Sequence, residues 1–138
     1  MKKFTKIMAL ALVAVMAMAV LVACGPASKP EKAAQALKDK GYVVTAVIPD
    51  DSTKGKLEQA SLDLIAKAAG LEEGDITATV TGTNGDESIS ITYFKSASVA
   101  KKYWDANKDQ IEEKEGWIVK QSGAMIYMGT EQAVKDAR

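Results

Sequence analysis

The chain carries a single thiol, at Cys24, and no histidine among its 138 residues. A lone cysteine cannot form a disulfide within one chain, and without histidine the usual neutral-pH base and a common zinc ligand are both missing. These residue types exclude Cys–His and Ser–His catalysis and every histidine-based metal site. What remains for chemistry is the Cys24 thiol, the carboxylates and the hydroxyls.

Two pairs of carboxylates lie in predicted loops. Asp50 and Asp51 follow a predicted strand, and Asp86 and Glu87 lie at the tip of a predicted hairpin. We expect these two points to meet at one edge of the sheet, where carboxylate oxygens could bind Ca²⁺. The alternative is that all four are ordinary solvated residues of exposed turns, and the EF-hand spacing is absent. We therefore predict no metal and no cofactor, with these four residues as the only metal candidates.

Hydroxyl side chains alternate with apolar ones along two neighbouring segments. One face of the expected hairpin carries Thr77, Thr79, Thr81, Ser88, Ser90 and Thr92. Such a face is either a flat recognition surface or simply the solvated side of a sheet whose other side is buried. Phe94 breaks the alternation and points away from Tyr93, so an outward Phe94 is a further candidate for an interface.

Charge is unevenly distributed along the chain. The 18 basic and 18 acidic residues balance, but the first 23 residues contain three lysines and no carboxylate. The remaining 115 residues therefore carry 15 basic and 18 acidic side chains. A mildly acidic body argues against binding to the phosphate backbone of nucleic acids.

Residues 1–23 have the organisation of a secretory signal peptide, with a basic start followed by an apolar run. The run closes with Leu21, Val22, Ala23 and Cys24, and these four positions resemble the lipobox of bacterial lipoproteins. The resemblance implies transfer of diacylglycerol to the Cys24 thiol and cleavage between Ala23 and Cys24. Two alternatives stay open. One is a transmembrane anchor, for which about 17 apolar residues are the lower limit; the other is an ordinary cleaved signal with an incidental cysteine.

An acylated Cys24 would be the first residue of the mature protein and would insert its acyl chains into membrane lipid. Residues 24–30 would then be a tether of at most ~20 Å, and residues 31–138 a single domain. By analogy with lipoprotein sorting, Gly25 is not the aspartate that retains proteins in the inner membrane. The expected location is the extracytoplasmic face of the bacterial cell membrane, or the outer membrane where one exists.

Helices and strands alternate through the body. Helices are predicted over residues 31–40 and 57–68, from Ser96 to Ile111, and from Thr130 onward. Residues 42–48 are almost continuously apolar, which predicts a strand buried on both faces. The periodicity of the second helix predicts that Leu57, Leu64 and Ile65 face the core.

Two hairpins are predicted from glycine-containing dipeptides. Asn84-Gly85 predicts a two-residue turn that pairs Val80 with Ile89 and Thr81 with Ser88. Ser122-Gly123 predicts a second turn between two short apolar strands.

After the first helix, the predicted order is β-α-β-β-α-β, the split βαβ arrangement of ferredoxin-like sandwiches. We therefore predict an α+β fold with an antiparallel sheet covered by helices on one face. An extra N-terminal helix, a C-terminal hairpin and a short terminal helix would complete it. The body resembles the small domains of unassigned function found on bacterial lipoproteins.

The expected function is that of a membrane-anchored, extracytoplasmic module that binds an envelope protein, a glycan or a small ligand without catalysis. Two alternatives remain open. One is an envelope enzyme that works with carboxylates alone, and the other is a structural or stress-response protein of the envelope.

Overall fold

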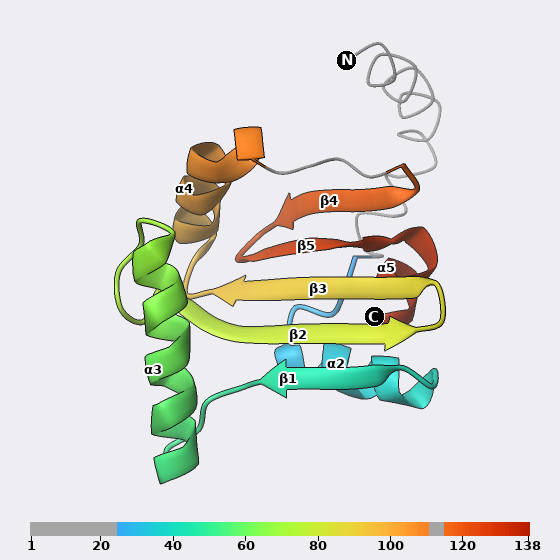
Figure 1. Ribbon diagram of the computed structural model, residues 1–138, viewed down its shortest axis with the longest axis horizontal. Helices are drawn as coiled ribbons and strands as arrows, with labels where there is room; N and C mark the ends of the chain where they lie inside the picture. Colours follow the sequence, from blue (N-terminus) through green and yellow to red (C-terminus); the bar gives the residue numbers. More distant parts are fainter. Residues whose placement is uncertain (1–24, 111–114) are drawn as a thin grey trace.

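The computed structural model describes residues 25–110 and 115–138, which form a five-stranded antiparallel sheet with helices packed against it (Figure 1). The strands are β1 (Val43–Val47), β2 (Ile76–Asn84), β3 (Glu87–Phe94), β4 (Trp117–Ser122) and β5 (Met125–Thr130). The helices are α2 (Pro30–Asp39), α3 (Thr53–Ala68), α4 (Ala97–Asn107) and α5 (Glu131–Asp136), with a 3₁₀ turn over Lys108–Gln110.

The predicted α+β class is confirmed. The proposed lipobox, Leu21 to Cys24, and the predicted helix end at Ile111 lie outside the described residues. Within the described part of the chain, none of the helices has the length and apolar character needed to cross a membrane.

The strands lie in the order β1-β2-β3-β5-β4, so the ferredoxin-like order is not confirmed. That order would place β1 beside β3, whereas β1 pairs with β2 as an antiparallel neighbour. The reason is that α3 lies at one end of the sheet and returns the chain to the adjacent strand (Figure 1). The split arrangement occurs in the second half of the molecule, where β5 lies between the parallel strands β3 and β4.

The larger core lies between the sheet and the helices α2 and α5. Val80, Ile91 and Tyr127 point to this side from three neighbouring strands, and Leu37 of α2 and Val134 of α5 are buried with them. The period-two alternation of strand side chains places these sheet residues on one face.

A smaller core lies on the opposite face, under α3 and α4. It contains Leu62, Phe94 and Ile126, together with the partly buried Tyr103. The prediction that helices cover only one face is therefore wrong, because Phe94 and Ile126 supply apolar area on the second face. This core covers only one end of that face, and the rest has no helix over it (Figure 1).

Both predicted hairpins are present, but each turns one residue later than predicted. Asn84 pairs with Glu87, so the turn residues are Gly85 and Asp86. Gly85 has φ +59°, and no described non-glycine residue has a positive φ. A positive φ at Gly85 followed by a negative φ at Asp86 fits a type II′ turn, in which glycine comes first. A type I′ turn at Asn84-Gly85 would require a positive φ at Asn84. The register between β2 and β3 moves by two residues, so the side chains keep their predicted faces. The second turn also begins with a glycine, Gly123, which has φ +56°.

The strand β1 is an edge strand, so the prediction that it is buried on both faces is wrong. Val43 is 75% exposed, although Val44 and Ala46 pack against the larger core. An apolar run does not distinguish a central strand from an edge strand, because the strands that lie beside it depend on the strand order of the whole sheet.

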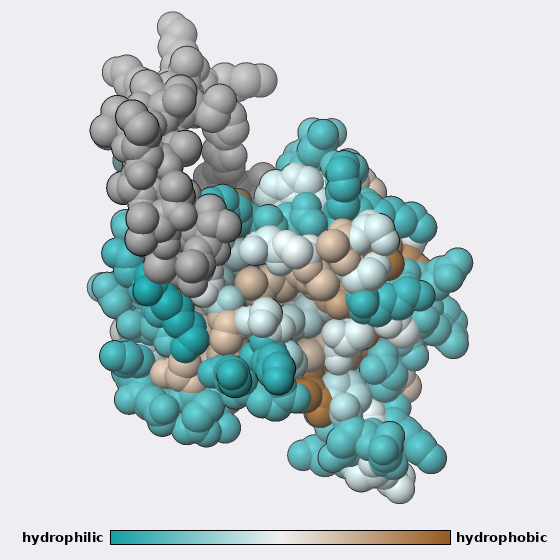
Figure 2. Space-filling view, turned by 180° about the vertical axis from the view of Figure 1, so that it is seen from behind, coloured by the Kyte–Doolittle hydropathy of each residue, from teal (hydrophilic) through white to brown (hydrophobic). Residues whose placement is uncertain are grey.

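Helix α3 buries a different side from the predicted one. Leu57, Leu64 and Ile65 are 67, 71 and 54% exposed, whereas Leu62 packs into the smaller core. Polar bonds set this rotation of the helix. The Asp63 carboxylate accepts from the amide of Gly74 at 2.8 Å, and the Gln59 side chain donates to the carbonyl of Ile76 at 3.1 Å. The first turns of α3 stand apart from the rest as a lobe (Figure 2).

Candidate functional site

The candidate site is the part of the second sheet face that α3 and α4 leave uncovered. We name it the open sheet surface. Its hydroxyl residues are Thr45 of β1, Thr79, Thr81 and Thr83 of β2, and Ser88, Ser90 and Thr92 of β3, and the exposed Val43 of β1 lies beside Thr83 on the same face. All seven hydroxyl residues are exposed or half-buried. The strand register places Thr81 between Thr45 and Ser90, so the hydroxyls form rows across three strands.

Five of the six predicted hydroxyl residues lie together on this surface. Because of the register change, Thr79 lies opposite Thr92 and Thr81 opposite Ser90. The sixth residue, Thr77, lies at a register irregularity between Ile76 and Ala78, and its hydroxyl donates to the carbonyl of Tyr93 at 3.3 Å. The irregularity also moves Ile76 from its predicted side into the smaller core.

Sequence reasoning missed Thr45, Thr83 and Met128. Thr45 lies in the strand that was expected to be buried on both faces, and Thr83 continues the alternation from Thr81 up to the turn. Met128 lies beside Ser90 and Val119 beside Met128, so apolar side chains border the hydroxyls on β5 and β4. Extension of the period-two pattern by one step would have identified Thr83.

The open sheet surface is electrically neutral but rich in hydrogen-bonding groups. The Thr81 hydroxyl donates to the carbonyl of Thr45 at 3.2 Å. A hydroxyl that donates still has lone pairs that can accept, so Thr81 can also receive a bond from a ligand. The nearest carboxylate along β3, Glu87, already accepts from the Thr130 hydroxyl.

Phe94 is not an interface residue, so that prediction is wrong. The ring does point away from Tyr93, as expected, but it is only 4% exposed. It packs in the smaller core against Tyr103, with the ring centroids 5.4 Å apart. The alternation correctly predicted the face but not the helices that cover it.

The structure does not bring the four candidate metal ligands together. In the antiparallel pairing of β1 with β2, Val43 lies beside Thr83 and Val47 beside Thr79. Asp50 and Asp51, which follow β1, therefore lie at the opposite end of the sheet from Asp86 and Glu87. The predicted meeting point required a different strand order. In the described part of the chain, no group of three or more His, Cys, Asp or Glu side chains is placed to hold a metal ion.

Asp75 is the buried charged residue of the described structure. Its carboxylate accepts from the amide of Glu72 at 2.9 Å and pairs with the Lys95 ammonium at 3.2 Å. The backbone hydrogen bond and the neighbouring Lys95 hold the pKa of Asp75 below its usual range. Asp75 is thus kept ionised and joins the loop after α3 to the end of β3.

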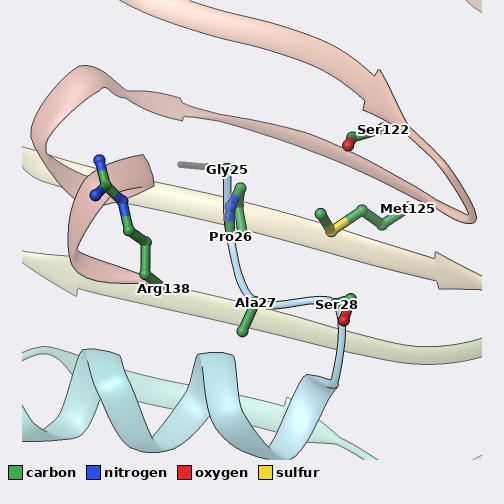
Figure 3. A pocket seen from close by; sticks show the side chains of 7 residues that line it. All are labelled: Gly25, Pro26, Ala27, Ser28, Ser122, Met125 and Arg138. Carbon is green, nitrogen blue, oxygen red and sulfur yellow. The ribbon is translucent and has the colours of Figure 1, made fainter. Parts of the chain in front are cut away.

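The residues before α2 are attached to the larger core. The amide of Ala27 donates to the carbonyl of Ala137 at 2.8 Å, and the Tyr93 hydroxyl donates to the carbonyl of Ala27 at 2.8 Å. Pro26 is buried. A hollow of about 330 Å³ lies beside this segment (Figure 3), and its lining is Gly25, Pro26, Ala27, Ser28, Ser122, Met125 and Arg138. Residues 25–28 of the predicted tether therefore belong to the folded body, and Cys24 lies outside the described residues.

We found no match to this chain among protein-family models, curated proteins or solved structures. The assignment of a function therefore rests on the sequence and geometry of the chain itself.

Proposed function

We propose that the protein is a lipid-anchored, extracytoplasmic binding protein whose ligand contacts the open sheet surface. The observation that carries the proposal is the contrast between the two faces of the sheet. Helices α2 and α5 cover one face, while hydroxyl side chains line an uncovered area of the other. A sheet face in contact with water needs polar residues; here they are neutral hydroxyls throughout β2 and β3, continued by Thr45 in β1.

The anchoring part of the proposal rests on the pattern Leu21-Val22-Ala23-Cys24 after an apolar run. The folded body begins directly afterwards, because Pro26 is buried and Ala27 packs against the larger core. A lipid on Cys24 would therefore hold the domain at the membrane surface. Substitution of Cys24 by alanine should leave an unlipidated precursor of higher mass, which mass spectrometry of membrane fractions detects.

The chemistry of the surface favours an uncharged, hydroxyl-bearing polymer, such as a glycan strand of the cell envelope. Serine and threonine hydroxyls both donate and accept hydrogen bonds, as do sugar hydroxyls. Met128 and Val119 border the hydroxyls and offer apolar contact to the C–H groups of a sugar ring. A small molecule usually binds in a concave pocket, whereas an extended polymer fits a flat surface.

Binding to isolated envelope glycan tests this assignment. We expect the protein without residues 1–24 to sediment with the glycan, and the double variant Thr81→Arg, Ser90→Arg to lose most of that binding. Gln35→Arg is the matched control, because Gln35 is exposed on α2, on the other side of the sheet. Equal retention of the double variant and the control would exclude the open sheet surface as the binding site. Retention of an envelope protein in place of glycan would reassign the ligand class.

A further inference from the structure

The first described residues of the chain are hydrogen-bonded to the folded body. Two hydrogen bonds of 2.8 Å fix Ala27, one from its amide to Ala137 and one to its carbonyl from Tyr93. Gly25 lies near the Tyr127 ring, because an ideal Cβ on Gly25 would be 3.4 Å from the tyrosine oxygen. Ala27 is thus bonded to the body through both its amide and its carbonyl, Pro26 is buried, and Gly25 is the one described residue before them.

We propose that the segment from Gly25 to Ser28 orients the domain, so that the surface around the hollow faces the phospholipid headgroups. This inference rests on the proposed acylation of Cys24. We name this area the anchor-side surface, formed by Gly25, Ser28, Ser122 and Arg138. Consecutive Cα atoms lie ~3.8 Å apart, so acyl chains on Cys24 enter the bilayer next to Gly25.

The charges of the anchor-side surface suit a phospholipid layer. Arg138 lines the hollow (Figure 3), and the acidic side chain beside the segment from Gly25 to Ser28 is Glu31, which is close enough to Tyr93 to help raise the pKa of its hydroxyl. Two further basic residues, both lysines, are exposed. Lys29 directly follows the segment from Gly25 to Ser28, and Lys120 lies on the same face of β4 as Ser122. Basic side chains close to a membrane are attracted by anionic lipids.

The same geometry turns the open sheet surface away from the membrane. Tyr93 and Tyr127, which hold the segment, belong to the larger core on the helix-covered face. The hydroxyls of the open sheet surface lie on the other face. Thr45 is also remote along the sheet, because β1 lies three strands from β5, or about 14 Å at the usual strand spacing. The orientation therefore leaves the proposed binding surface free for an envelope ligand.

Site-directed labelling of the complete lipoprotein tests the orientation. When Cys24 is acylated, its sulfur is a thioether, so an added cysteine is the single free thiol. Ser122→Cys and Thr45→Cys would each carry a nitroxide in vesicles of phosphatidylethanolamine and phosphatidylglycerol. We expect a nickel chelate attached to the lipid headgroups to relax the label at position 122 several-fold more than the label at position 45. Ser122 is far from Cys24 in sequence, so its proximity to lipid reports the fold and not the chain connection.

A spacer supplies the matched control. About six Gly/Ser residues between Gly25 and Pro26 add a reach of ~20 Å while the proposed lipobox stays unchanged. We expect this insertion to abolish the difference between the two labels. Equal relaxation of both labels in verified lipidated protein would overturn the orientation and leave the lipoprotein assignment intact. Absence of lipid on Cys24, seen by mass spectrometry, would overturn both proposals.

Discussion

Single residues decide how the loop after α3 is held. Asp75 has little contact with water, yet its carboxylate has two partners of its own, the amide of Glu72 and the Lys95 ammonium. A buried carboxylate without such partners would oppose folding, because desolvation penalises the charged form. Asp75 therefore contributes to stability through its ionised form, which gives the contribution a pH dependence.

We expect Asp75→Asn to lower the free energy of unfolding at neutral pH. The folded pKa of Asp75 lies below the unfolded value of about 3.9, so the charged form is stabilising above that pH. The contribution is lost as the pH falls through the lower, folded pKa. Urea unfolding should show wild type and variant converging between neutral and strongly acidic pH. The variant Asp51→Asn, at an exposed position, should remain close to wild type throughout.

At Gly129 the backbone of the neighbouring strand β3 leaves no room for a side chain. A Cβ at this position would lie 2.7 Å from the carbonyl oxygen of Ser88 and 2.9 Å from the Cα of Ile89. Neither atom can move without displacing β3. We expect Gly129→Ala to cost about 1–3 kcal/mol, as overpacking does in cores, measured by thermal or urea unfolding.

The control for this variant is Gly25→Ala, whose added Cβ would lie 3.4 Å from the Tyr127 oxygen, an ordinary contact. Its stability should stay within about 0.5 kcal/mol of wild type. Equal stability of the two variants would contradict the packing argument at Gly129.

At the scale of elements, α3 shows how helix rotation is chosen. Its most regular apolar stripe, which includes Leu57 and Leu64, faces solvent, while Leu62 and Ala66 enter the smaller core. The C-terminal end is fixed by a Schellman cap, in which the amide of Leu71 donates to the carbonyl of Ala66 at 2.8 Å. The cap, together with the Gln59 and Asp63 bonds, positions the helix with respect to β2.

Leu62 and Leu64, two residues apart on α3, should therefore differ strongly in how much they contribute to the stability of the fold. We expect Leu62→Ala to cost about 2–5 kcal/mol, because it leaves a cavity in the smaller core. We expect Leu64→Ala to change stability by less than about 0.5 kcal/mol, since Leu64 is exposed. Urea unfolding of both variants measures the difference. A larger loss for Leu64→Ala would show that the predicted stripe, not the observed one, contacts the core.

At the scale of the whole molecule, the two ends of the described chain are joined. The segment before α2 is bonded to Ala137 at the end of α5 and to Tyr93 in the centre of the sheet. A region held in this way should open less often than a free terminus, which is the basis of the proposed orientation.

Tyr93→Phe should loosen this junction selectively. The variant keeps the ring in the core and removes the bond to the carbonyl of Ala27, a net contribution of about 1 kcal/mol. We expect faster hydrogen exchange at the amide of Ala27 and unchanged exchange at Ile91 in the sheet centre. Unchanged exchange at Ala27 would mean that the Tyr93 bond does not hold the segment.

The sequence predicted much of the local structure and part of the site. Helices α2, α4 and α5, both hairpins and the common face of Thr79, Thr81, Ser88, Ser90 and Thr92 follow from it. Phe94 as an interface, and the meeting of Asp50 with Asp86, failed for a shared reason. Each depended on which distant element lies next to a strand.

The sequence by itself determined the helices, the strands, the two hairpins and the alternation of side chains, because these depend on contacts within a few residues. Only the tertiary structure decided the strand order, the rotation of α3, the burial of Phe94 and the attachment of Ala27. Each of these depends on pairs of residues far apart in the chain. Packing and hydrogen bonds between such residues produce no periodic pattern in the sequence from which they could be predicted.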